Sequence, residues 1–402
     1  MATTLLINRA GLMVMTFLSL YLIEEFNYSE SEAGFIVGFY GIGSIVGVAL
    51  GGYLAGIVGF LRIQILALIT SGIVFISMFY ATEYMQFIIL TFLVSATADQ
   101  FRPANMASVP WFSSKKNRTR SIALIRLAIN LGISIGPAVG GFLVIKLGYS
   151  SLFWVDGITC IVAGIFLFIT LGAKDPALED RKNFEEVRTE IIQAAKNSKL
   201  LDPRFYWLLV ANFFWAFAFF QIIYGFTVFM KNDLFFDELT IGLFYTFNGL
   251  AIFFIEMPLV QALQKRNTVR VLKIGVVLCA ISFIFLYCPL FSFVFLYFGK
   301  SFVILFPILY MVFITVGEMF YLPFTNTLAL EFTNEEGRAK QMGYYAQSFS
   351  ISHVLGPMIG LWLADTYGFD KLWILCFVIM ILVFFMTQKL KKPSGIQPNS
   401  PL

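Results

Sequence analysis

Long apolar segments alternate with short polar stretches along the whole chain. Twelve such segments can be counted, and each is long enough for the about 20 helical residues that cross a hydrocarbon core of roughly 30 Å. They occupy residues 8–26, 34–60, 63–82, 86–110, 120–146, 150–172, 205–230, 239–263, 270–289, 300–330, 338–365 and 370–388. A buried helix of a soluble protein has the same periodicity, but so many segments in succession predict an all-α integral membrane protein with twelve transmembrane helices.

The second half of the chain repeats the first. At an offset of 220 residues, seven positions coincide without a gap: Arg118, Gly136, Pro137, Gly140, Leu143, Gly148 and Leu152 match Arg338, Gly356, Pro357, Gly360, Leu363, Gly368 and Leu372. At an offset of 208, Gly34, Phe39, Gly41 and Arg62 match Gly242, Phe247, Gly249 and Arg270. A parallel repeat in an apolar chain is typical of transporters whose substrate site lies between two halves.

The longest polar stretch divides the chain in the middle. We predict an N-terminal six-helix half at 1–172, a cytoplasmic central loop at 173–204, a C-terminal six-helix half at 205–390 and a cytoplasmic tail at 391–402. Within the loop, Phe184, Val187, Ile191 and Ala195 recur at helical spacing, which predicts an amphipathic helix on the inner membrane surface. A solvated linker helix without membrane contact is the alternative.

Composition and charge agree with a membrane location. The chain is 59% hydrophobic and 13% charged, with a mean hydropathy of +0.82, whereas soluble domains are about 45–50% apolar and about 25% charged. Basic residues gather in the loops of one side and acidic residues in those of the other, so the positive-inside rule places both termini in the cytoplasm of the inner (plasma) membrane. The net charge of +4 reflects this topology and indicates no nucleic-acid partner. The first segment is longer than the apolar part of a signal peptide, so we expect it to be retained.

The sequence offers little for catalysis. Its four cysteines lie in or beside apolar segments without C-x-x-C spacing, so we predict no disulfide framework, no metal site and no cofactor. Neither H-E-x-x-H, G-x-S-x-G nor a P-loop occurs, and the polar loops are too short for a catalytic domain. These observations argue against the alternative of a membrane-embedded enzyme or sensor.

Stripes of small residues recur every four positions on three segments. They comprise Gly43, Gly47, Gly51, Ala55 and Gly59; Ala128, Gly132, Gly136 and Gly140; and Ser348, Ser352, Gly356, Gly360, Ala364 and Gly368. Such stripes let helix backbones approach closely in lipid, where apolar burial does not drive association between helices. They therefore predict tight helix packing, and smooth faces on which two halves can rock.

The fifth segment carries a motif that resembles a known family. Its stretch from Gly132 to Gly141 has the pattern g-x-x-x-G-P-x-x-G-G, with Gly136, Pro137, Gly140 and Gly141 at the other fixed positions. In this respect the chain resembles the major facilitator superfamily, and more narrowly its drug:proton antiporter exporters. The resemblance covers nearly the whole chain. It implies the major facilitator fold of two pseudo-symmetric six-helix halves, a monomer, and a small-molecule substrate exchanged for protons.

A second family motif is altered here. The loop between the second and third segments keeps Gly52 and Gly59 and is followed by Arg62, but Gly56 stands where the family has an aspartate. That aspartate and its basic neighbours help to latch the cytoplasmic face in the family, so the resemblance implies a different or absent latch in this chain. Arg102, in the fourth segment, matches an arginine motif of the family weakly.

Ionisable residues inside a bilayer are costly, which makes each a candidate for function. Asp99 and Arg102 share one face of the fourth segment, and Glu318 lies near the middle of the tenth. A carboxyl group desolvated there can take up and release a proton, so we predict Asp99, Arg102 and Glu318 as proton-coupling residues. A permanent structural ion pair for Asp99 with Arg102, and a hydrogen-bonded packing role for Glu318, are the alternatives.

Four further polar residues have weaker assignments. Glu256, beside Pro258, and His353, three residues before Gly356-Pro357, are added to the proton-coupling set; a histidine titrates near neutral pH, although a packed hydrogen-bonding role is the alternative for it. Arg126 and Asn130 lie one turn apart, and we expect Arg126 to reach the headgroup region. They join the conformational set, which comprises Gly52, Gly59, Arg62, Arg126, Asn130, Gly132, Gly136, Pro137, Gly140, Gly141, Gly356 and Pro357.

The substrate site is predicted from polar and aromatic residues on the segments of the second half. They are Asn212, Gln221, Tyr224, Asn248, Tyr321, Tyr344 and Tyr345. With 47 phenylalanines and 17 tyrosines, an aromatic cavity suited to amphipathic or hydrophobic organic molecules is expected. The sequence therefore predicts proton-coupled efflux of such a compound by alternating access. A proton-coupled symporter that imports a peptide, sugar or other metabolite is the alternative.

Overall fold

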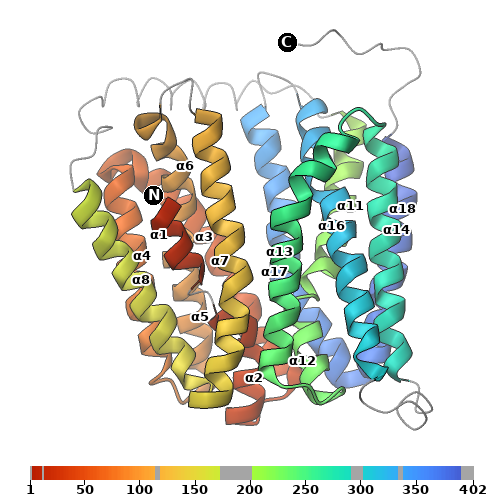
Figure 1. The fold of residues 1–402 in the computed structure, drawn as a ribbon, viewed down its shortest axis with the longest axis horizontal. Coiled ribbons are helices and arrows are strands. Elements are labelled where there is room, and N and C mark those ends of the chain that lie inside the picture. The colour runs from red at the N-terminus through yellow and green to blue at the C-terminus, as the bar shows by residue number, and fades with distance from the viewer. Residues whose placement is uncertain are drawn as a thin grey trace.

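The structure is a computed structural model that describes residues 2–10, 13–113, 118–172, 202–290, 302–333 and 338–390. Helices account for the regular structure of these residues, and they contain no strand. Figure 1 shows two bundles side by side, α1 to α8 in one and α11 to α18 in the other. The predicted all-α major facilitator fold of two six-helix halves is confirmed.

The elements of the two bundles follow the predicted segments closely. The N-terminal half contains α1 (Ala2–Ala10), α2 (Val14–Phe26), α3 (Glu30–Val58), α4 (Phe60–Met78), α5 (Tyr84–Ala98), α6 (Phe101–Phe112), α7 (Arg118–Leu147) and α8 (Ser150–Leu171). The C-terminal half contains α11 (Pro203–Phe220), α12 (Gly225–Asn232), α13 (Glu238–Leu263), α14 (Thr268–Tyr287), α16 (Leu305–Glu331), α17 (Arg338–Tyr367) and α18 (Phe369–Thr387), with short 3-10 turns at Cys288–Leu290 and Gln388–Leu390.

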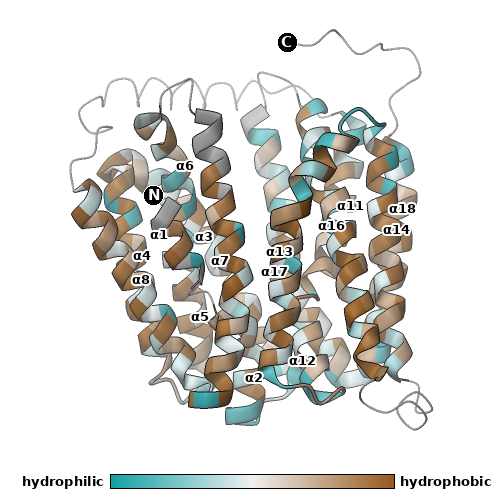
Figure 2. Ribbon diagram, in the orientation of Figure 1, coloured by the Kyte–Doolittle hydropathy of each residue, from teal (hydrophilic) through white to brown (hydrophobic). Residues whose placement is uncertain are grey.

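In the described part of the chain, nine helical segments are long and apolar enough to cross a membrane, by length and composition alone. The remaining three spans are the interrupted pairs α1–α2 and α5–α6 and the more polar α17. Figure 2 shows hydrophobic residues along the length of the helices and hydrophilic residues concentrated toward their ends. This distribution is expected for a bundle surrounded by lipid.

Three spans are broken near their middle. The first breaks around Met13, the fourth at Asp99 and Gln100, and the seventh between Gln221 and Tyr224. At the first break, the buried carboxylate of Asp156 in α8 accepts hydrogen bonds from the backbone N–H groups of Met13 (2.9 Å) and Val14 (2.7 Å). These N–H groups open α2 and have no partner within the helix, so Asp156 satisfies donors that lipid cannot.

The two halves meet along two seams related by the internal repeat. In one seam α3 packs against α17, and a side chain at Gly34 would lie 2.6 Å from the carbonyl oxygen of Pro357. In the other, α13 packs against α7, and a side chain at Gly242 would clash with the carbonyl oxygen of Pro137. Since Gly34 corresponds to Gly242 and Pro137 to Pro357, both seams use the same backbone contact.

These contacts close one end of the molecule. The seams involve the first part of α3 and α13 and the last part of α7 and α17, and α2 packs against α12 beside them. Figure 1 shows the loops that follow α2 and α12 at this same end, which we call the closed end. Beyond Gly41, the glycines of α3 turn away from the other half, because Gly43, Gly47 and Gly51 pack against Ser95, Ala96 and Gln100 of their own bundle. This confirms the packing role predicted for that stripe.

Some predictions concern residues outside the described ranges. The amphipathic helix with Phe184, Val187, Ile191 and Ala195, and the tail at 391–402, belong to that part of the chain, as does the Arg126 side chain. Their predicted roles, and the exact limits of the two halves and the central loop, remain predictions.

Substituting a seam glycine tests whether backbone contact holds the closed end together. Gly34→Ala and Gly242→Ala each place a methyl group against a carbonyl oxygen, so we expect a loss of about 1–3 kcal/mol for the conformation with this end closed. Spin labels on the α2–α3 and α12–α13 loops would then report longer distances. Gly52→Ala is the matched control on α3, because its nearest neighbour would lie 3.9 Å away. Unchanged distances in both seam variants would contradict this account.

The broken first span offers a second test. Asp156→Leu leaves the N–H groups of Met13 and Val14 buried without acceptors, which predicts a stability loss of about 1–3 kcal/mol or more. Asp156→Asn retains one carbonyl acceptor and should lose less. The measurement is thermal unfolding of the purified protein in detergent. Equal stability of the Leu variant and the native protein would show that Asp156 does not hold the break.

Candidate functional site

A cavity of about 450 Å³ lies between the halves, next to the two seams. Its walls come from spans of both bundles, as expected for a site at the interface of two repeats. The lining residues are Met15, Thr16, Tyr40, Asn130, Ile133 and Pro137 from the N-terminal half and Phe219, Ile222, Ile223, Tyr224, Tyr245, Asn248, Gly249, Ile252, Glu256, Glu318, Met319, Leu322, Pro323 and His353 from the C-terminal half.

A carboxylate pair lies on the C-terminal wall. Glu256 of α13 and Glu318 of α16 both line the cavity and interact electrostatically. Asn248 lies within hydrogen-bonding range of the Glu318 carboxyl and donates its amide to Thr315 Oγ1 at 2.8 Å. The second oxygen of Glu318, Oε2, is buried and has no hydrogen-bond partner among the described residues. Glu318 thus offers a buried acceptor oxygen close to a second carboxyl group.

Aromatic rings surround His353, where the cavity meets the α3–α17 seam. His353 Nε2 lies 2.8 Å from the Tyr224 hydroxyl, and its ring stacks on Phe220 with centroids 4.2 Å apart. Tyr40, from the other half, meets the same imidazole edge to face at 5.7 Å. The histidine therefore joins the broken seventh span to a helix of the opposite bundle.

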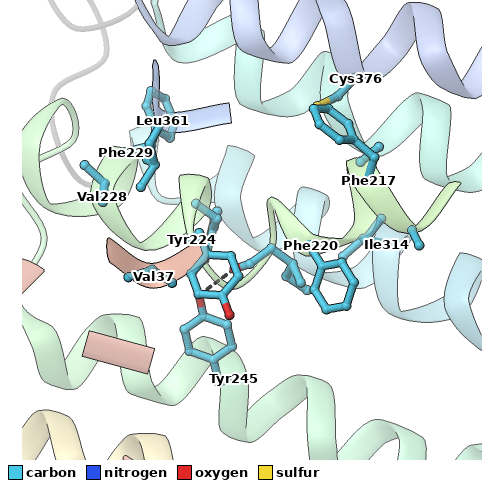
Figure 3. Close-up of a cluster of buried hydrophobic side chains, with 14 of the residues drawn as sticks. Val37, Phe217, Phe220, Tyr224, Val228, Phe229, Tyr245, Ile314, Leu361 and Cys376 are labelled. Atoms are coloured by element: carbon cyan, nitrogen blue, oxygen red, sulfur yellow. Dashed lines mark hydrogen bonds between the residues drawn. The ribbon is translucent and has the colours of Figure 1, made fainter. Parts of the chain in front are cut away.

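Tyr245 fixes the break in the seventh span. Its hydroxyl donates to the carbonyl of Ile222 at 2.5 Å and lies 2.5 Å from Thr227 Oγ1. Figure 3 shows Tyr245 directly beside Tyr224, with Val37 of α3 nearby. Gln221 adds a bond from its side-chain amide to the carbonyl of Gly356, at 2.9 Å. The irregular backbone is thus held by the Tyr245 side chain of α13, and its Gln221 side chain is bound by a backbone carbonyl of α17. Such internal partners are the condition for tolerating irregular backbone at membrane depth.

The internal repeat shows how unequal the two walls are. At the 208 offset Tyr40 corresponds to Asn248 and Val48 to Glu256, and at the 220 offset Ile133 corresponds to His353 and Ala98 to Glu318. Glu256, Glu318 and His353 therefore have apolar residues at the equivalent positions of the N-terminal half. The N-terminal wall still contains polar groups, because Thr16, Tyr40 and Asn130 line the cavity.

The predicted coupling residues do not all meet. Glu256, Glu318 and His353 line the cavity, but Asp99 and Arg102 do not. Asp99 is buried where α5 ends, Arg102 is exposed on α6, and the ion pairs seen among the described residues do not join them. Both still act electrostatically on the Tyr40 hydroxyl. The structure thus places Asp99 behind the cavity wall, within electrostatic reach of it.

The predicted substrate residues divide in the same way. Tyr224 and Asn248 line the cavity, whereas Asn212, Tyr321 and Tyr345 pack inside the C-terminal half. There Asn212 bonds to Ser348 at 2.8 Å, Tyr345 bonds to Thr325 at 3.1 Å, and Tyr321 stacks on Trp215 at 4.2 Å. Tyr344 is exposed on α17. Gln221 lies at the break of the seventh span and donates its side-chain amide to the carbonyl of Gly356. The structure thus brings Tyr224 and Asn248 to the cavity and places the other five elsewhere, because residues on one helix point to different sides. The substrate role of the seven residues stays a prediction.

The conformational set mostly lies at helix contacts. Gly140 packs against Met13 and Phe17, Gly141 against Glu238, and Gly356 against Phe220. Gly132 and Gly136 are buried in α7, while Pro137 contributes to both the seam and the cavity. Gly59 has a φ of 100° between α3 and α4, a value that favours glycine. Arg62 is exposed on α4.

Sequence reasoning missed Asp156 and the N-terminal lining residues. Asp156 is an acid within an apolar segment, and the rule that singled out Asp99 would have found it. Met15 and Ile133 carry no comparable signal, because apolar residues line cavities and face lipid alike.

Polar contacts between the halves reinforce the closed end. Across the halves, Asn232 donates to Glu30 at 3.3 Å and Tyr149 donates to Glu238 at 2.6 Å. Lys231, in the same half as Glu238, also bonds to this carboxylate at 2.6 Å. Asp233, in the loop before α13, is partly buried beside a second hollow, and this burial raises the pKa of its carboxyl from 3.8 to about 6. A carboxyl whose pKa is raised binds protons more readily here than in water, so acid favours the conformation that buries it.

Comparison with known proteins identifies the family. A family model described as Major Facilitator Superfamily matches residues 1–316, so the chain belongs to that superfamily. It is 25% identical over 216 residues to the cis,cis-muconate transport protein of Acinetobacter baylyi, a match spanning 52% of each chain, or about half of that relative's length. It is 22% identical to the uncharacterized MFS-type transporter YttB of Bacillus subtilis, covering 92% of this chain and 88% of that one.

Other similar proteins have different transport activities. A Na(+), Li(+), K(+)/H(+) antiporter of Planococcus maritimus is 25% identical over 169 residues, which are 40% of this chain and 39% of the relative. A POT family transporter solved with 5-aminolevulinic acid has a TM-score of 0.78 at 14% identity, covering 97% of this chain and 96% of that one. The nucleoside transporter NupG has a TM-score of 0.74 at 14% identity, covering 97% and 100%. Family and fold together establish a multi-pass secondary transporter of a small molecule.

The pKa of Asp233 predicts a pH-dependent closed end. Between pH 7.5 and 5, the native protein should shift toward the conformation with this end closed, because Asp233 takes up a proton near pH 6 only while buried. Spin-label distances across the closed end measure this shift. Asp233→Asn should remove this contribution, whereas Asp237→Asn, at an exposed residue of the same loop, should keep it. An identical pH response in Asp233→Asn would refute the assignment.

Proposed function

We propose that this transporter exports an amphipathic organic compound in exchange for protons, by alternating access at the central cavity. The observation that carries the proposal is the Glu318 carboxyl, which lines the cavity and lies within electrostatic range of Glu256. One of its oxygens is buried and has no hydrogen-bond partner within the described part of the chain. A carboxyl in such surroundings can exist in protonated and ionised forms, and an arriving ligand can change the balance between them.

The proposed mechanism depends on two neighbouring carboxyl groups in a cavity of low dielectric constant. We take Glu318 as the group that carries a proton while no substrate is bound, because an isolated charge in a low-dielectric cavity is costly. A substrate that neutralises the negative charge at this site makes ionisation less costly, so the proton is released when the substrate binds. Proton and substrate then compete for one site, which is the thermodynamic requirement for antiport. Asp99 is the second candidate for the coupling group, acting through Tyr40 from behind the N-terminal wall.

The orientation gives this conformation a place in the transport cycle. Basic residues cluster in the loops at the end opposite the closed end, for example Lys265, Arg266 and Arg270 around the α13–α14 connection. In the proposed orientation, this side and both termini lie in the cytoplasm of the plasma membrane. The closed end then faces outward, and an export substrate loads from the cytoplasm in this state. We take the monomer, with its two halves, as the working unit.

The importer alternative is less well supported by the cavity. A peptide or amino-acid substrate carries a carboxylate that needs a basic partner, and the described lining residues include neither lysine nor arginine. The same absence disfavours a dianion. The antiporter motif on α7, with Pro137 at both a seam and the cavity, also favours exchange.

Proton flux in proteoliposomes tests the proposal. With an imposed pH gradient, substrates drawn from lipophilic amines, neutral drugs and short peptides should stimulate proton movement in the native protein. Glu318→Gln should abolish this coupled flux, because a neutral amide neither releases a proton nor balances a charge. Glu24→Gln, an exposed carboxyl at the closed end, is the control that should retain it.

The outcomes separate the candidates. Loss in Asp99→Asn with retention in Glu318→Gln would move the coupling group to α5. Retention in both variants would refute the carboxylate mechanism. Substrate accumulation inside vesicles along the proton gradient, rather than exchange against it, would establish the symporter alternative.

A further inference from the structure

The N-terminal wall of the cavity presents polar side chains that the protein itself does not use. Thr16, Tyr40 and Asn130 come from α2, α3 and α7, and all three line the cavity and are partly buried. Within the described part of the chain, neither the two hydroxyls nor the Asn130 amide makes a hydrogen bond. Water satisfies such groups while the cavity is free, so a ligand that displaces this water must replace its hydrogen bonds.

The polar side chains of the C-terminal wall are engaged instead. Asn248 donates its amide to Thr315 Oγ1, and the Tyr245 hydroxyl donates to the backbone at the break of the seventh span. The Tyr224 hydroxyl and His353 Nε2 bond to each other. The N-terminal wall is therefore where a ligand finds amide and hydroxyl groups that it can bind without breaking a bond of the protein.

Asn130 lies where the α7–α13 seam opens into the cavity. Ser134, one turn further along α7, is buried against Gly249 of α13, and its backbone carbonyl accepts a hydrogen bond from Thr246 at 2.6 Å. Ser134 Oγ in turn donates to the carbonyl of Asn130 at 2.6 Å. The backbone that carries the Asn130 amide is thus anchored to the other half, and such pre-organisation lowers the entropic cost of binding a ligand.

Tyr40 has the corresponding place at the α3–α17 seam. At its neighbour Gly41, an added side chain would lie 2.8 Å from the backbone nitrogen of Val354, and the Tyr40 ring meets His353 edge to face. The ring is therefore held by the C-terminal half while its hydroxyl stays available. Because both side chains line one cavity of about 450 Å³, within the roughly 300–1,000 Å³ of sites for drug-sized ligands, a single molecule can contact both.

The chemistry of an asparagine side chain defines the group that pairs with it. The amide carries a carbonyl acceptor beside N–H donors in one plane. Its complement is a planar group with a donor beside an acceptor, which an uncharged carboxamide or lactam supplies and an ester does not. A carboxylate has acceptors alone, and it would add a charge to the cavity that already contains Glu318.

We propose that Asn130 determines the specificity of the cavity by pairing with an uncharged amide group of the transported compound, and that the Tyr40 hydroxyl forms a further hydrogen bond with it. This inference rests on the proposed function, because it takes the central cavity as the transport site, and it specifies the substrate class. The apolar part of the compound lies against Met15 and Ile133, which line the same wall. A compound without the amide leaves Asn130 unpaired, and sites built to bind a polar group reject such analogues strongly.

Equilibrium binding to the purified full-length protein tests the substrate class without any proton gradient. The probes are naphthylbutanamide, its N,N-dimethylamide and the corresponding methyl ester, which share one apolar body. We expect the primary amide to bind about 10-fold more tightly than the other two, because neither of them has an N–H donor. In Asn130→Leu this preference should disappear. In Tyr40→Phe, which keeps the ring against His353, binding of the primary amide should weaken by a few-fold.

Ser350 provides the matched control. It is equivalent to Asn130 in the repeat, but it does not line the cavity, and its hydroxyl donates to the carbonyl of Ala346. Ser350→Ala should therefore keep the native preference for the primary amide. Asn130→Gln, which keeps the amide on a longer side chain, should retain part of this preference.

The ester shows which variants can be interpreted, because its binding reports an intact cavity. Should Asn130→Leu fail to bind the ester, Tyr40→Phe and Asn130→Gln decide the result. Equal affinity of the native protein for the three probes, or an unchanged preference in a variant of Asn130 that lacks the amide, would overturn the proposal. Tighter binding of naphthylbutanoate than of the amide would overturn it in favour of organic acids.

This experiment is separable from the test of exchange. Amide selectivity at equilibrium without coupled proton flux in proteoliposomes would preserve the Asn130 site and refute antiport. Proton flux stimulated equally by the amide and the ester would preserve antiport and refute the amide site.

Discussion

The structure depends on close backbone contact between two glycines and two proline carbonyls. Gly34 against Pro357, and Gly242 against Pro137, bring helices of opposite halves together at distances that leave no room for a side chain. In lipid no hydrophobic force draws helices together, so such contact supplies the packing that water would otherwise drive. Because the two contacts are equivalent in the internal repeat, they form a symmetric pair of contacts that we call the hinge. The cavity lies next to these seams, and Pro137 contributes to both.

On this symmetric hinge the chain has built an asymmetric site. The C-terminal half contributes Glu256, Glu318 and His353 to the cavity, and the positions equivalent to them in the other half are apolar. The breaks in the first and seventh spans are equally asymmetric, because different side chains hold them. One is held by Asp156 from within its own half, whereas the other is held by Tyr245 and Gln221 beside the cavity. The two halves thus share a backbone arrangement, whereas their side chains at equivalent positions differ in chemistry and in the contacts that they make.

The sequence predicted the fold well, because segment length and repetition depend on residues that can be counted along the chain. The twelve segments, the two halves and the close packing of the α3 glycines all followed from apolar length and small-residue spacing. The site was harder to predict, because membership of the cavity depends on helix rotation. Tyr321 lies three residues after Glu318 on α16, yet it stacks on Trp215 inside the half while Glu318 lines the cavity. Asp156 shows the reverse case, an acid within an apolar segment that sequence reasoning passed over and that holds a helix break.

His353 links ligand binding to the seams. It lines the cavity, bonds to Tyr224 at the broken span, and sits at the point of α17 that Gly41 of α3 approaches, since a side chain at Gly41 would lie 3.0 Å from its carbonyl carbon. A ligand changes a conformational equilibrium only by the difference between its affinities for the two states. A ligand that contacts this cavity touches residues whose neighbours form the seam, so its affinity depends on whether the seam is closed. The short distance between the carboxylate wall and the hinge is therefore what allows one bound molecule to bias the whole transporter.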